Sequence, residues 1–160
     1  MTKQSENENV LVDYAGFLVR RMWQIHVAMF LQETKGSGMT PLQFSILLVL
    51  QREPELEQVE LAYQVGLDRS NLSEILSRMV SGGLVKCSPS QLDRRAKVAR
   101  LTAKGQQLIR KLSDQVRRSH ELLLEDLSVQ EKSQFIKLMK KVVGAKNEFG
   151  RARFSMRDSG

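Results

Sequence analysis

The chain has 160 residues, of which 41% are hydrophobic and 27% charged, and this composition indicates a globular protein with a buried core. Its longest apolar run, FSILLVL at 44–50, is far shorter than the ~20 residues that span a membrane, and the polar opening MTKQSENENV has no export-leader pattern. A single cysteine excludes an intrachain disulfide framework, so we expect a cytoplasmic chain with no membrane partner.

The net charge of +7 is concentrated in the middle third of the sequence. Residues 69–118 carry 12 Lys and Arg against three acidic residues, whereas residues 1–68 carry 5 basic and 9 acidic residues. A basic segment of this kind is the electrostatic footprint of a protein that binds a polyanion. A solvated surface without special function would show the same excess, so charge alone leaves both interpretations open.

The first predicted element is a helix from about Val12 to Glu33, because apolar residues recur there at helical spacing. Those residues are Phe17, Leu18, Met22, Ile25, Met29 and Phe30. After the loop TKGSG, the stretch from Thr40 to Gln43 combines an N-cap, a proline at the first helical position and a capping-box glutamine. A second helix should therefore run to about Gln51, and its nearly continuous apolar sequence predicts an interior position.

Two shorter helices joined by a tight turn should follow. The first runs from about Leu56 to Gln64 and ends at Gly66 in a left-handed conformation. The second follows the N-cap Asp68 and runs from about Arg69 to Val80. The residues expected to face inward are Val59, Leu61 and Ala62 in the first helix, and Leu72, Ile75, Leu76 and Met79 in the second. Two such helices around the turn VGLD form a helix-turn-helix.

A β-hairpin and two further helices complete the predicted order. Leu84–Ser88 and Lys97–Leu101 are expected to be short strands around a polar turn, Thr102 to start a long helix, and the capping box at 128–131 to start the last helix. Predicted inward residues are Leu108, Ile109, Leu112, Val116 and Leu123, then Phe135, Leu138, Met139 and Val142. The fold class is mainly α with a small β-hairpin wing, a winged helix-turn-helix, and the tail from Gly150 should be mobile.

The outward face of the second short helix carries polar side chains that suit contact with base edges. Its residues are Arg69, Ser70, Asn71, Ser73, Glu74, Ser77 and Arg78. Short side chains let a helix enter the major groove, where Asn71 can pair with adenine, and Ser70 and Ser73 can reach bases or phosphates. Glu74 either reads a cytosine amino group or orients a neighbouring arginine, and both readings stay open.

The stretch DRRAKVARLTAKG at 93–105 places further cations on the hairpin. Arg94 and Arg95 at its tip can enter a minor groove, and Asp93 can hold the Arg95 guanidinium in a fixed pose. The cations expected to neutralise flanking phosphates are Lys97, Arg100 and Lys104. Alone, such a run would be interpreted as an ordinary charged turn. Behind a helix-turn-helix, it favours contact with double-stranded DNA.

The stretches TPLQFSILLVL (40–50), ELAYQVGLDRSNLSEILSRMVSGGLV (60–85) and DRRAKVARLTAKG (93–105) resemble the MarR family of winged-helix transcription regulators. By position, Ser70, Asn71, Ser73 and Arg78 fall on the family's recognition helix, and Asp93 and Arg95 on its wing. The resemblance implies a homodimer on a palindromic operator, usually as a repressor. Cys87 departs from the pattern, since members often carry arginine just after the first wing strand begins, and this puts one phosphate contact in doubt.

The same resemblance implies a division of the chain. Residues 1–38 would form an N-terminal dimerisation helix, 39–101 the DNA-binding domain, 102–149 the C-terminal dimerisation helices, and 150–160 a flexible tail. Members commonly release DNA when a small ligand binds between the dimerisation and DNA-binding parts. Such a ligand would therefore be expected at the first helix.

The first helix, FLVRRMWQIHVAMFLQE at 17–33, is similar to a subset of the family that responds to aromatic carboxylates or their CoA thioesters. Arg20 offers a cation, Trp23 and Phe30 offer stacking surfaces, and His26 or Gln24 offers a hydrogen-bonding group. Arg21 would meet the phosphates of a CoA ester. The alternative is a dimer-interface helix in which Trp and Phe are core residues and the histidine is merely hydrogen-bonded.

Other classes of function are weighed against this interpretation. Cys87 beside Lys86 would make a redox-responsive regulator only if its thiol were accessible and its pKa lowered. A winged-helix module that binds protein or RNA is a further alternative. His26 and His120 are the only histidines, and neither has a nucleophile or metal-ligand partner at a useful spacing, nor is there a glycine-rich phosphate loop. We therefore expect no enzyme activity, no metal and no cofactor.

Overall fold

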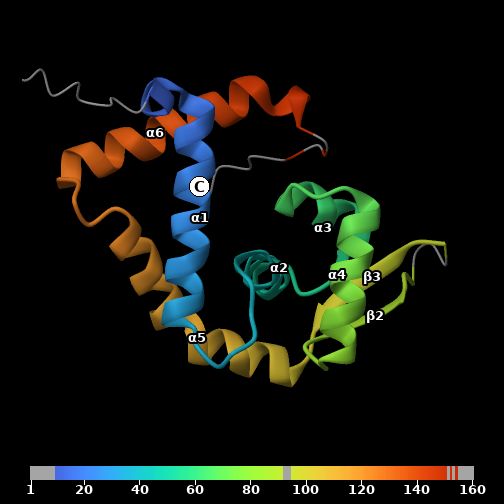
Figure 1. The fold of residues 1–160 in the computed structure, drawn as a ribbon. Coiled ribbons are helices and arrows are strands. Elements are labelled where there is room, and N and C mark those ends of the chain that lie inside the picture. The colour runs from blue at the N-terminus through green and yellow to red at the C-terminus, as the bar shows by residue number, and fades with distance from the viewer. Residues whose placement is uncertain (1–9, 92–94, 151, 153, 155–160) are drawn as a thin grey trace, which may run out of the picture.

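The computed structural model describes residues 10–91, 95–150, 152 and 154, and it shows a mainly helical chain with one small sheet (Figure 1). The helices are α1 (Ala15–Glu33), α2 (Pro41–Arg52), α3 (Gln58–Val65), α4 (Arg69–Ser81), α5 (Ala103–Leu123) and α6 (Val129–Lys146). Short 3-10 helices precede α1 and follow α6, namely η1 (Val10–Asp13) and η2 (Asn147–Phe149). The strands are β1 (Leu56–Glu57), β2 (Val85–Pro89) and β3 (Lys97–Leu101). The predicted fold class is confirmed, with small shifts at element ends.

The sheet has three antiparallel strands in the order β1-β3-β2, where the sequence predicted a two-stranded hairpin. Leu56 was expected to begin a helix, and this is wrong, because it pairs with Ala99 across the free edge of β3 and the helix begins at Gln58. Val59, expected to face inward, is 44% exposed. A pairing with a strand some forty residues away leaves no local signal, which explains both errors.

The core lies around α2, which contacts α3, α5 and β3 and is seen end-on between the long helices and the helix-turn-helix (Figure 1). The largest fully buried side chains are Phe30, Ile46, Leu47, Leu50, Leu61, Leu72, Leu76, Met79, Val85 and Ile109. The predicted buried stripe of α4 is confirmed at all four positions. Leu48 is the one apolar residue of α2 that is exposed, at 42%, alongside the polar Ser45, Gln51 and Arg52.

Helix caps form where the sequence placed them. Thr40 and Gln43 exchange both hydrogen bonds of a capping box, at 3.2 and 3.1 Å, and Ser128 and Glu131 do so at 3.3 and 2.8 Å. Gly66 ends α3 with φ of 68°, a conformation that favours glycine. These local signals fix the starts of α2 and α6 and the turn before α4.

The first turn of α5 is locked to the beginning of the wing. The Thr102 hydroxyl donates to Gly83 O at 2.7 Å and accepts from the Gly105 backbone N–H at 3.0 Å. A Cβ on Gly105 would lie 2.3 Å from Leu84 O, so only glycine allows this approach. The stretch LTAKG therefore joins α5 rigidly to the sheet.

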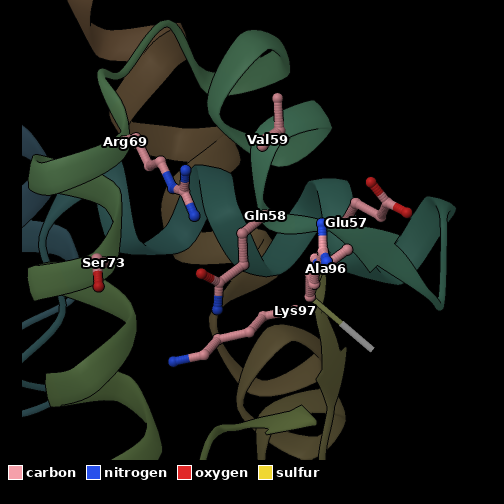
Figure 2. Close-up of a pocket in the computed structure, with 8 residues that line it drawn as sticks. Glu57, Gln58, Val59, Arg69, Ser73, Ala96 and Lys97 are labelled. Atoms are coloured by element: carbon pink, nitrogen blue, oxygen red, sulfur yellow. The ribbon is translucent and has the colours of Figure 1, made fainter. Parts of the chain in front are cut away.

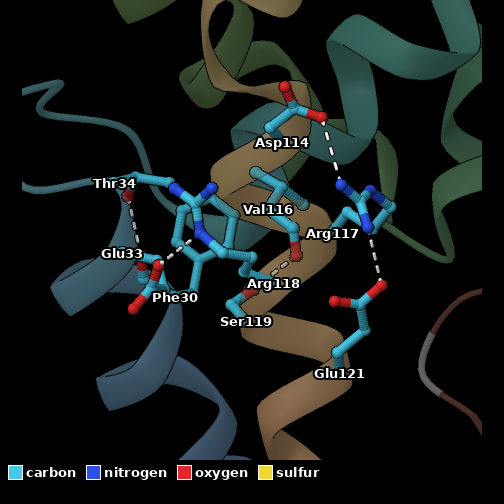
Figure 3. A network of polar contacts seen from close by, with 9 residues as sticks. All are labelled: Phe30, Glu33, Thr34, Asp114, Val116, Arg117, Arg118, Ser119 and Glu121. Atoms are coloured by element: carbon cyan, nitrogen blue, oxygen red, sulfur yellow. Dashed lines mark hydrogen bonds and ion pairs between the residues drawn. The ribbon is translucent and has the colours of Figure 1, made fainter.

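α1 packs along α5, and polar contacts fix its C-terminal end (Figure 3). The Arg118 guanidinium on α5 lies 3.2 Å from the Glu33 carboxylate on α1. The buried Thr34 hydroxyl donates to Phe30 O at 2.7 Å, and the buried Ser119 hydroxyl donates to Val116 O at 2.7 Å. α1 begins at Ala15 and not near Val12, because η1 and the uncapped Tyr14 interrupt the helical run.

α6 was expected to bury Phe135, Leu138, Met139 and Val142, and for the single chain this is wrong. No residue of 129–146, a stretch described throughout, is buried, and Leu138 and Val142 are 52% and 63% exposed. The main contact of α6 within the described chain is η2. The amphipathic pattern is present, but nothing in the described part of the chain covers the apolar face.

Beyond η2, the described part of the tail turns back toward the helix-turn-helix. The Asn147 amide donates to Phe154 O at 2.6 Å. The Phe154 ring lies against Gly66, where a Cβ would be 3.5 Å from its Cδ2. The end of α6 and the α3–α4 turn are thereby in contact with one short segment.

Candidate nucleic-acid interface

α4 presents an unbroken polar face to solvent while its apolar stripe is buried. Each outward residue predicted from the sequence is exposed: Arg69, Ser70, Asn71, Ser73, Glu74, Ser77 and Arg78. Leu72 and Leu76, on the opposite face, are fully buried in the core. The apolar face of the helix is thus packed against the core and its polar face is open to solvent, as insertion into a groove requires.

Asp68 caps α4, as predicted, and also accepts hydrogen bonds from two side chains of the first helical turn. Its carboxylate accepts the Asn71 backbone N–H at 2.9 Å, the Ser70 hydroxyl at 3.0 Å and the Asn71 side-chain amide at 2.5 Å. These hydrogen bonds, with that of the Asn71 backbone the largest contribution, lower the pKa of Asp68. Two of the predicted base-reading side chains are therefore already oriented by an ionised neighbour.

Glu74 and Arg78 form an ion pair one helical turn apart, with 3.5 Å between Oε1 and Nη1. Of the two readings left open for Glu74, this geometry favours the one in which it orients an arginine. Both side chains remain largely exposed, and such pairs contribute about 0.3–0.5 kcal/mol. The pair can therefore open when the helix meets a partner.

A hollow of about 130 Å³ lies between the first turns of α4, the start of α3 and the turn end of the wing (Figure 2). Its lining residues are Glu57, Gln58, Val59, Arg69, Ser73, Arg95, Ala96 and Lys97. Arg69 and Lys97 extend toward Gln58 and Ser73 from different elements. Sequence reasoning missed Gln58, because it assigned this position to the interior of a helix; its polar side chain at a helix start was the available signal.

The wing cations separate into two groups. Arg95 and Lys97 are exposed and line the hollow, beside α4. Arg100 instead pairs with Glu55 and ties the wing to the loop before β1. Lys104, at the start of α5, donates from its ammonium to Gly82 O at 2.8 Å, at the end of α4. Asp93 and Arg94 lie outside the described residues. The predicted pair between Asp93 and Arg95 therefore also lies outside them.

Cys87 is exposed on β2, opposite Ala99 of β3. Its sulfur accepts a hydrogen bond from the Gln58 amide at 3.4 Å. The contact joins the first wing strand to the start of α3 and fixes Gln58 at the edge of the hollow. Cys87 thus stands near the interface as a neighbour of Gln58.

Some of the predicted ligand-binding residues come together at the seam between α1 and α5. The His26 ring stacks on His120 of α5 at 5.2 Å between centroids, with Trp23 at 5.6 Å and Phe30 at 6.5 Å. Phe30 in turn meets Phe44 of α2 at 6.2 Å. Sequence reasoning missed His120 in this cluster, since nothing local links it to a helix some ninety residues earlier.

The two predicted arginines of α1 do not join this ring cluster. The Arg20 guanidinium lies over the Phe17 ring at 5.3 Å, and Arg21 donates to the Gln24 side chain at 3.1 Å. Gln24, the alternative to His26 as hydrogen-bonding group, is exposed. His26 is therefore the polar member of α1 that the geometry brings to the cluster.

His26 carries an unsatisfied polar atom. Its Nδ1 is buried and has no hydrogen-bond partner among the residues the structure describes. Burial, and to a lesser degree the nearby His120, lower the pKa of His26 below its ordinary value. The imidazole is thus neutral at pH 7 and retains hydrogen-bonding capacity at Nδ1.

Two other features are absent from the described part of the chain. Within it, no three His, Cys, Asp or Glu side chains gather as metal ligands would. None of its helices is both long and apolar enough to cross a membrane. The polar face of α4, the wing cations and the ring cluster remain as the candidate sites.

Sequence comparison places this geometry among known proteins. A sequence model of the MarR family matches residues 37–96, which hold the helix-turn-helix and most of the wing. The chain is 27% identical over 140 residues to the HTH-type transcriptional repressor NicR of Pseudomonas putida, covering 88% of this chain and 89% of that protein. The match thus extends well beyond the DNA-binding segment.

Solved structures agree with this assignment. The PcaV transcriptional regulator of Streptomyces coelicolor, in complex with its natural ligand, aligns with a TM-score of 0.79 and 31% identity over 84% of this chain and 95% of that one. BpsR of Bordetella bronchiseptica, described with regulation of its DNA binding by 6-hydroxynicotinic acid, aligns with a TM-score of 0.77 and 25% identity over 81% and 93%. The shared fold, the polar recognition face and the matched segment lead to one conclusion: this chain belongs to the MarR family of transcriptional regulators.

Proposed function

We propose that this regulator is a repressor that lays α4 in the major groove of operator DNA and its wing in the adjacent minor groove. The observation that carries the proposal is the hollow between them, where Arg69, Arg95 and Lys97 converge from two elements. A backbone phosphate seated there would meet cations as well as the Ser73 hydroxyl and the Gln58 amide. Arg95, next to the hairpin tip, would follow the narrow minor groove.

We further propose that the active species is a homodimer. The exposed apolar residues of the first and last helical segments support this: Val10, Leu11, Val12, Leu18, Val19, Ile136, Leu138, Val142 and Val143. A surface of this kind is covered in a stable protein, and a second copy would cover it with its own equivalent. Residues 1–38 and 102–149 would then serve dimerisation and 39–101 DNA binding, with two α4 helices about one DNA turn apart on a palindromic site.

The ring cluster at the α1–α5 seam supports a small aromatic acid, or its CoA thioester, as the effector. Trp23, which is 56% exposed, offers a ring face in front of the buried Phe30, and the buried Nδ1 of His26 offers a hydrogen bond that the described chain leaves unused. The similar protein BpsR, described with regulation of its DNA binding by 6-hydroxynicotinic acid, is consistent with a small aromatic acid. Exposed Arg21 would meet the phosphates if a CoA ester is bound.

A physical route from effector to DNA is available. Phe30 of the cluster contacts Phe44 of α2, and α2 packs on α3, the first helix of the helix-turn-helix. An effector that binds more tightly to an arrangement unsuited to DNA would shift the population toward it. Release of DNA would follow from that difference in affinity.

An electrophoretic mobility shift assay with the DNA upstream of the protein's own gene tests the proposal that it binds DNA. We expect a discrete complex whose affinity falls steeply with salt, because phosphate contacts release counterions. Equal retardation of single-stranded RNA, or of duplexes of unrelated sequence, would contradict a sequence-specific DNA reader.

Calorimetry of the purified protein against aromatic acids and their CoA esters tests the effector. Binding should be accompanied by a lower affinity for the same duplex. Absence of binding to all of them, with DNA affinity unchanged, would remove the effector from the proposal and leave the repressor standing.

A further inference from the structure

We infer that Asp68 determines the base preference of α4, by fixing which hydrogen-bonding groups Ser70 and Asn71 present to the major groove. The inference rests on the proposed function, in which α4 reads operator DNA. Asp68 is half-buried at the start of the helix and acts through its neighbours, so it is a positioning residue and not a base-contacting one.

The orientation of Asn71 follows from the chemistry of a carboxylate. An ionised carboxylate only accepts hydrogen bonds, so the Asn71 amide must turn its nitrogen toward Asp68, and Nδ2 lies 2.5 Å from Oδ2. The carbonyl oxygen of that amide is then left without a partner in the described chain, on an exposed side chain. Asn71 therefore presents an acceptor to whatever approaches α4.

Ser70 is constrained by the same carboxylate. Its hydroxyl donates its single hydrogen to Asp68 Oδ1 at 3.0 Å, so only the lone pairs of its oxygen remain available. A serine that is otherwise both donor and acceptor becomes an acceptor alone. Asp68 thus leaves Ser70 as an acceptor and turns the Asn71 carbonyl oxygen outward, while one N–H of that amide stays available as a donor.

Acceptors select a particular pair of bases. In the major groove, adenine N6 and cytosine N4 are the amino donors, whereas guanine and thymine present acceptors at the matching positions. Adenine additionally offers N7 to the second hydrogen of the Asn71 amide. The base facing Asn71 should therefore be adenine, with cytosine tolerated and guanine and thymine rejected.

The constraint holds over the physiological pH range. Hydrogen bonds from the Asn71 backbone and from the Ser70 and Asn71 side chains lower the pKa of Asp68, so the carboxylate stays ionised and cannot donate. A protonated carboxyl group would lose this property, but only under acid conditions.

Two variants separate the orienting role from the capping role. Asp68→Ser keeps an oxygen that accepts the Asn71 backbone N–H, and serine is as good an N-cap as aspartate, but it lacks the second oxygen that holds the amide. Asp68→Asn also keeps the cap. The amide nitrogen of the new asparagine side chain would donate to the Asn71 carbonyl oxygen, and the Asn71 amide would flip to accept this hydrogen bond.

The measurement is binding to a set of duplexes that carry each base at every operator position. Wild type should discriminate about 10- to 100-fold against guanine and thymine at one position per half-site. Asp68→Ser should reduce this to within about threefold, and Asp68→Asn should shift the preference toward guanine or thymine. Thermal unfolding followed by circular dichroism should show both variants as stable as wild type.

A double-variant cycle with Asn71→Ala completes the test. Removing a negative charge near DNA raises affinity for every sequence alike, and this effect is the same with or without Asn71, so the cycle removes it. If Asp68 acts through Asn71 at the base position that faces Asn71, adding Asp68→Ser to Asn71→Ala should change the preference at that position no further, whereas a change at the position facing Ser70 is still expected. A full additional change at the position facing Asn71 would overturn the inference.

The outcomes also separate this inference from the proposed function. Wild type that retards no duplex would contradict the repressor itself. Wild-type base preference retained in both Asp68 variants would leave the repressor intact and reduce Asp68 to a helix cap. Unchanged preference in Asn71→Ala would likewise overturn the inference, since there would be no reader for Asp68 to orient.

Discussion

α4 and α6 are both capped, amphipathic helices, but only α4 buries its apolar face within the described chain. α4 buries Leu72, Ile75, Leu76 and Met79 against the core, whereas no residue of 129–146 is buried in the described chain. The sequence pattern predicted a buried stripe for each. The difference teaches that helical periodicity reveals an apolar face but does not reveal what covers it.

The covering elements explain the contrast. α4 is packed by α3 and β2, which are its immediate neighbours in the chain. α6 is last in the chain, and its main described contact is the short η2 that follows it. A second copy of the molecule would provide the apolar surface that packs on α6, as α3 and β2 do for α4 within one chain.

The largest expected effect comes from charging the open face of α6. Leu138→Glu combined with Val142→Glu should convert a dimer to a monomer, because two carboxylates would be buried in the interface. Affinity for the full operator should fall by about 100- to 10,000-fold, since the avidity of two linked half-sites is lost. Sedimentation equilibrium and mobility shifts measure the two effects.

A matched control for that variant lies on the same helix. Lys140→Glu changes charge at an exposed polar position of α6 and should leave the oligomeric state unchanged. A monomeric wild type, or a double variant that remains dimeric, would place the dimer interface elsewhere.

The equivalent change in α4 acts on the folding of one chain and not on assembly. Leu72→Ala should lower the free energy of unfolding by about 2–5 kcal/mol, because it leaves a cavity in the core. Urea denaturation measures the loss. A decrease below about 1 kcal/mol would mean that α4 is less firmly packed than its burial indicates.

Most of the fold could be predicted from local signals, and the errors are non-local. The caps at Thr40, Thr102 and Ser128 and the left-handed Gly66 follow from residue type and spacing. β1 was missed because two residues gained their structure from pairing with β3. A pairing of that kind depends on the whole fold and not on the segment.

The candidate site shows the same division. Exposure of the polar face of α4 followed from its amphipathic pattern. The engagement of Arg100 with Glu55, the stacking of His120 on His26 and the position of Gln58 at the hollow join residues far apart in sequence. Only the folded chain reveals which cations of the basic middle third remain available for a phosphate.

A moderate effect is expected at the outer face that α4 shares with the wing. Arg95→Ala should weaken binding by about tenfold for all duplexes alike and reduce the slope of log affinity against log salt by about one. Arg117→Ala is the control, because that exposed arginine pairs with Asp114 and Glu121 on α5. An equal loss in both variants would indicate a general effect of net charge.

A smaller effect is expected at the cap of α6. Ser128→Ala removes one half of the capping box and should lower stability by about 1 kcal/mol. Since α6 is proposed to be held by a second copy, the loss should appear in the concentration-dependent unfolding of the dimer. Loss of stability that is independent of protein concentration would contradict that coupling.

The smallest effect concerns His26, which lies at the seam between α1 and α5. Its pKa is lowered in the folded chain, by burial and by His120, from an ordinary value of 6.5. Below that pH the unfolded chain binds more protons than the folded one. The contribution of neutral His26 to the free energy of unfolding is therefore complete above about pH 6.5 and is lost as the pH falls. His26→Gln should remove this part of the pH dependence, and His120→Gln should weaken it.

The same histidine should report on an anionic effector. A bound carboxylate favours the imidazolium, so binding should raise the pKa of His26 and take up protons in mildly acid solution. Calorimetry in two buffers of different ionisation heat measures this uptake, which should vanish in His26→Gln. Proton uptake that persists in the variant would place the titrating group elsewhere, and an effector bound without uptake would lie away from the stacked rings.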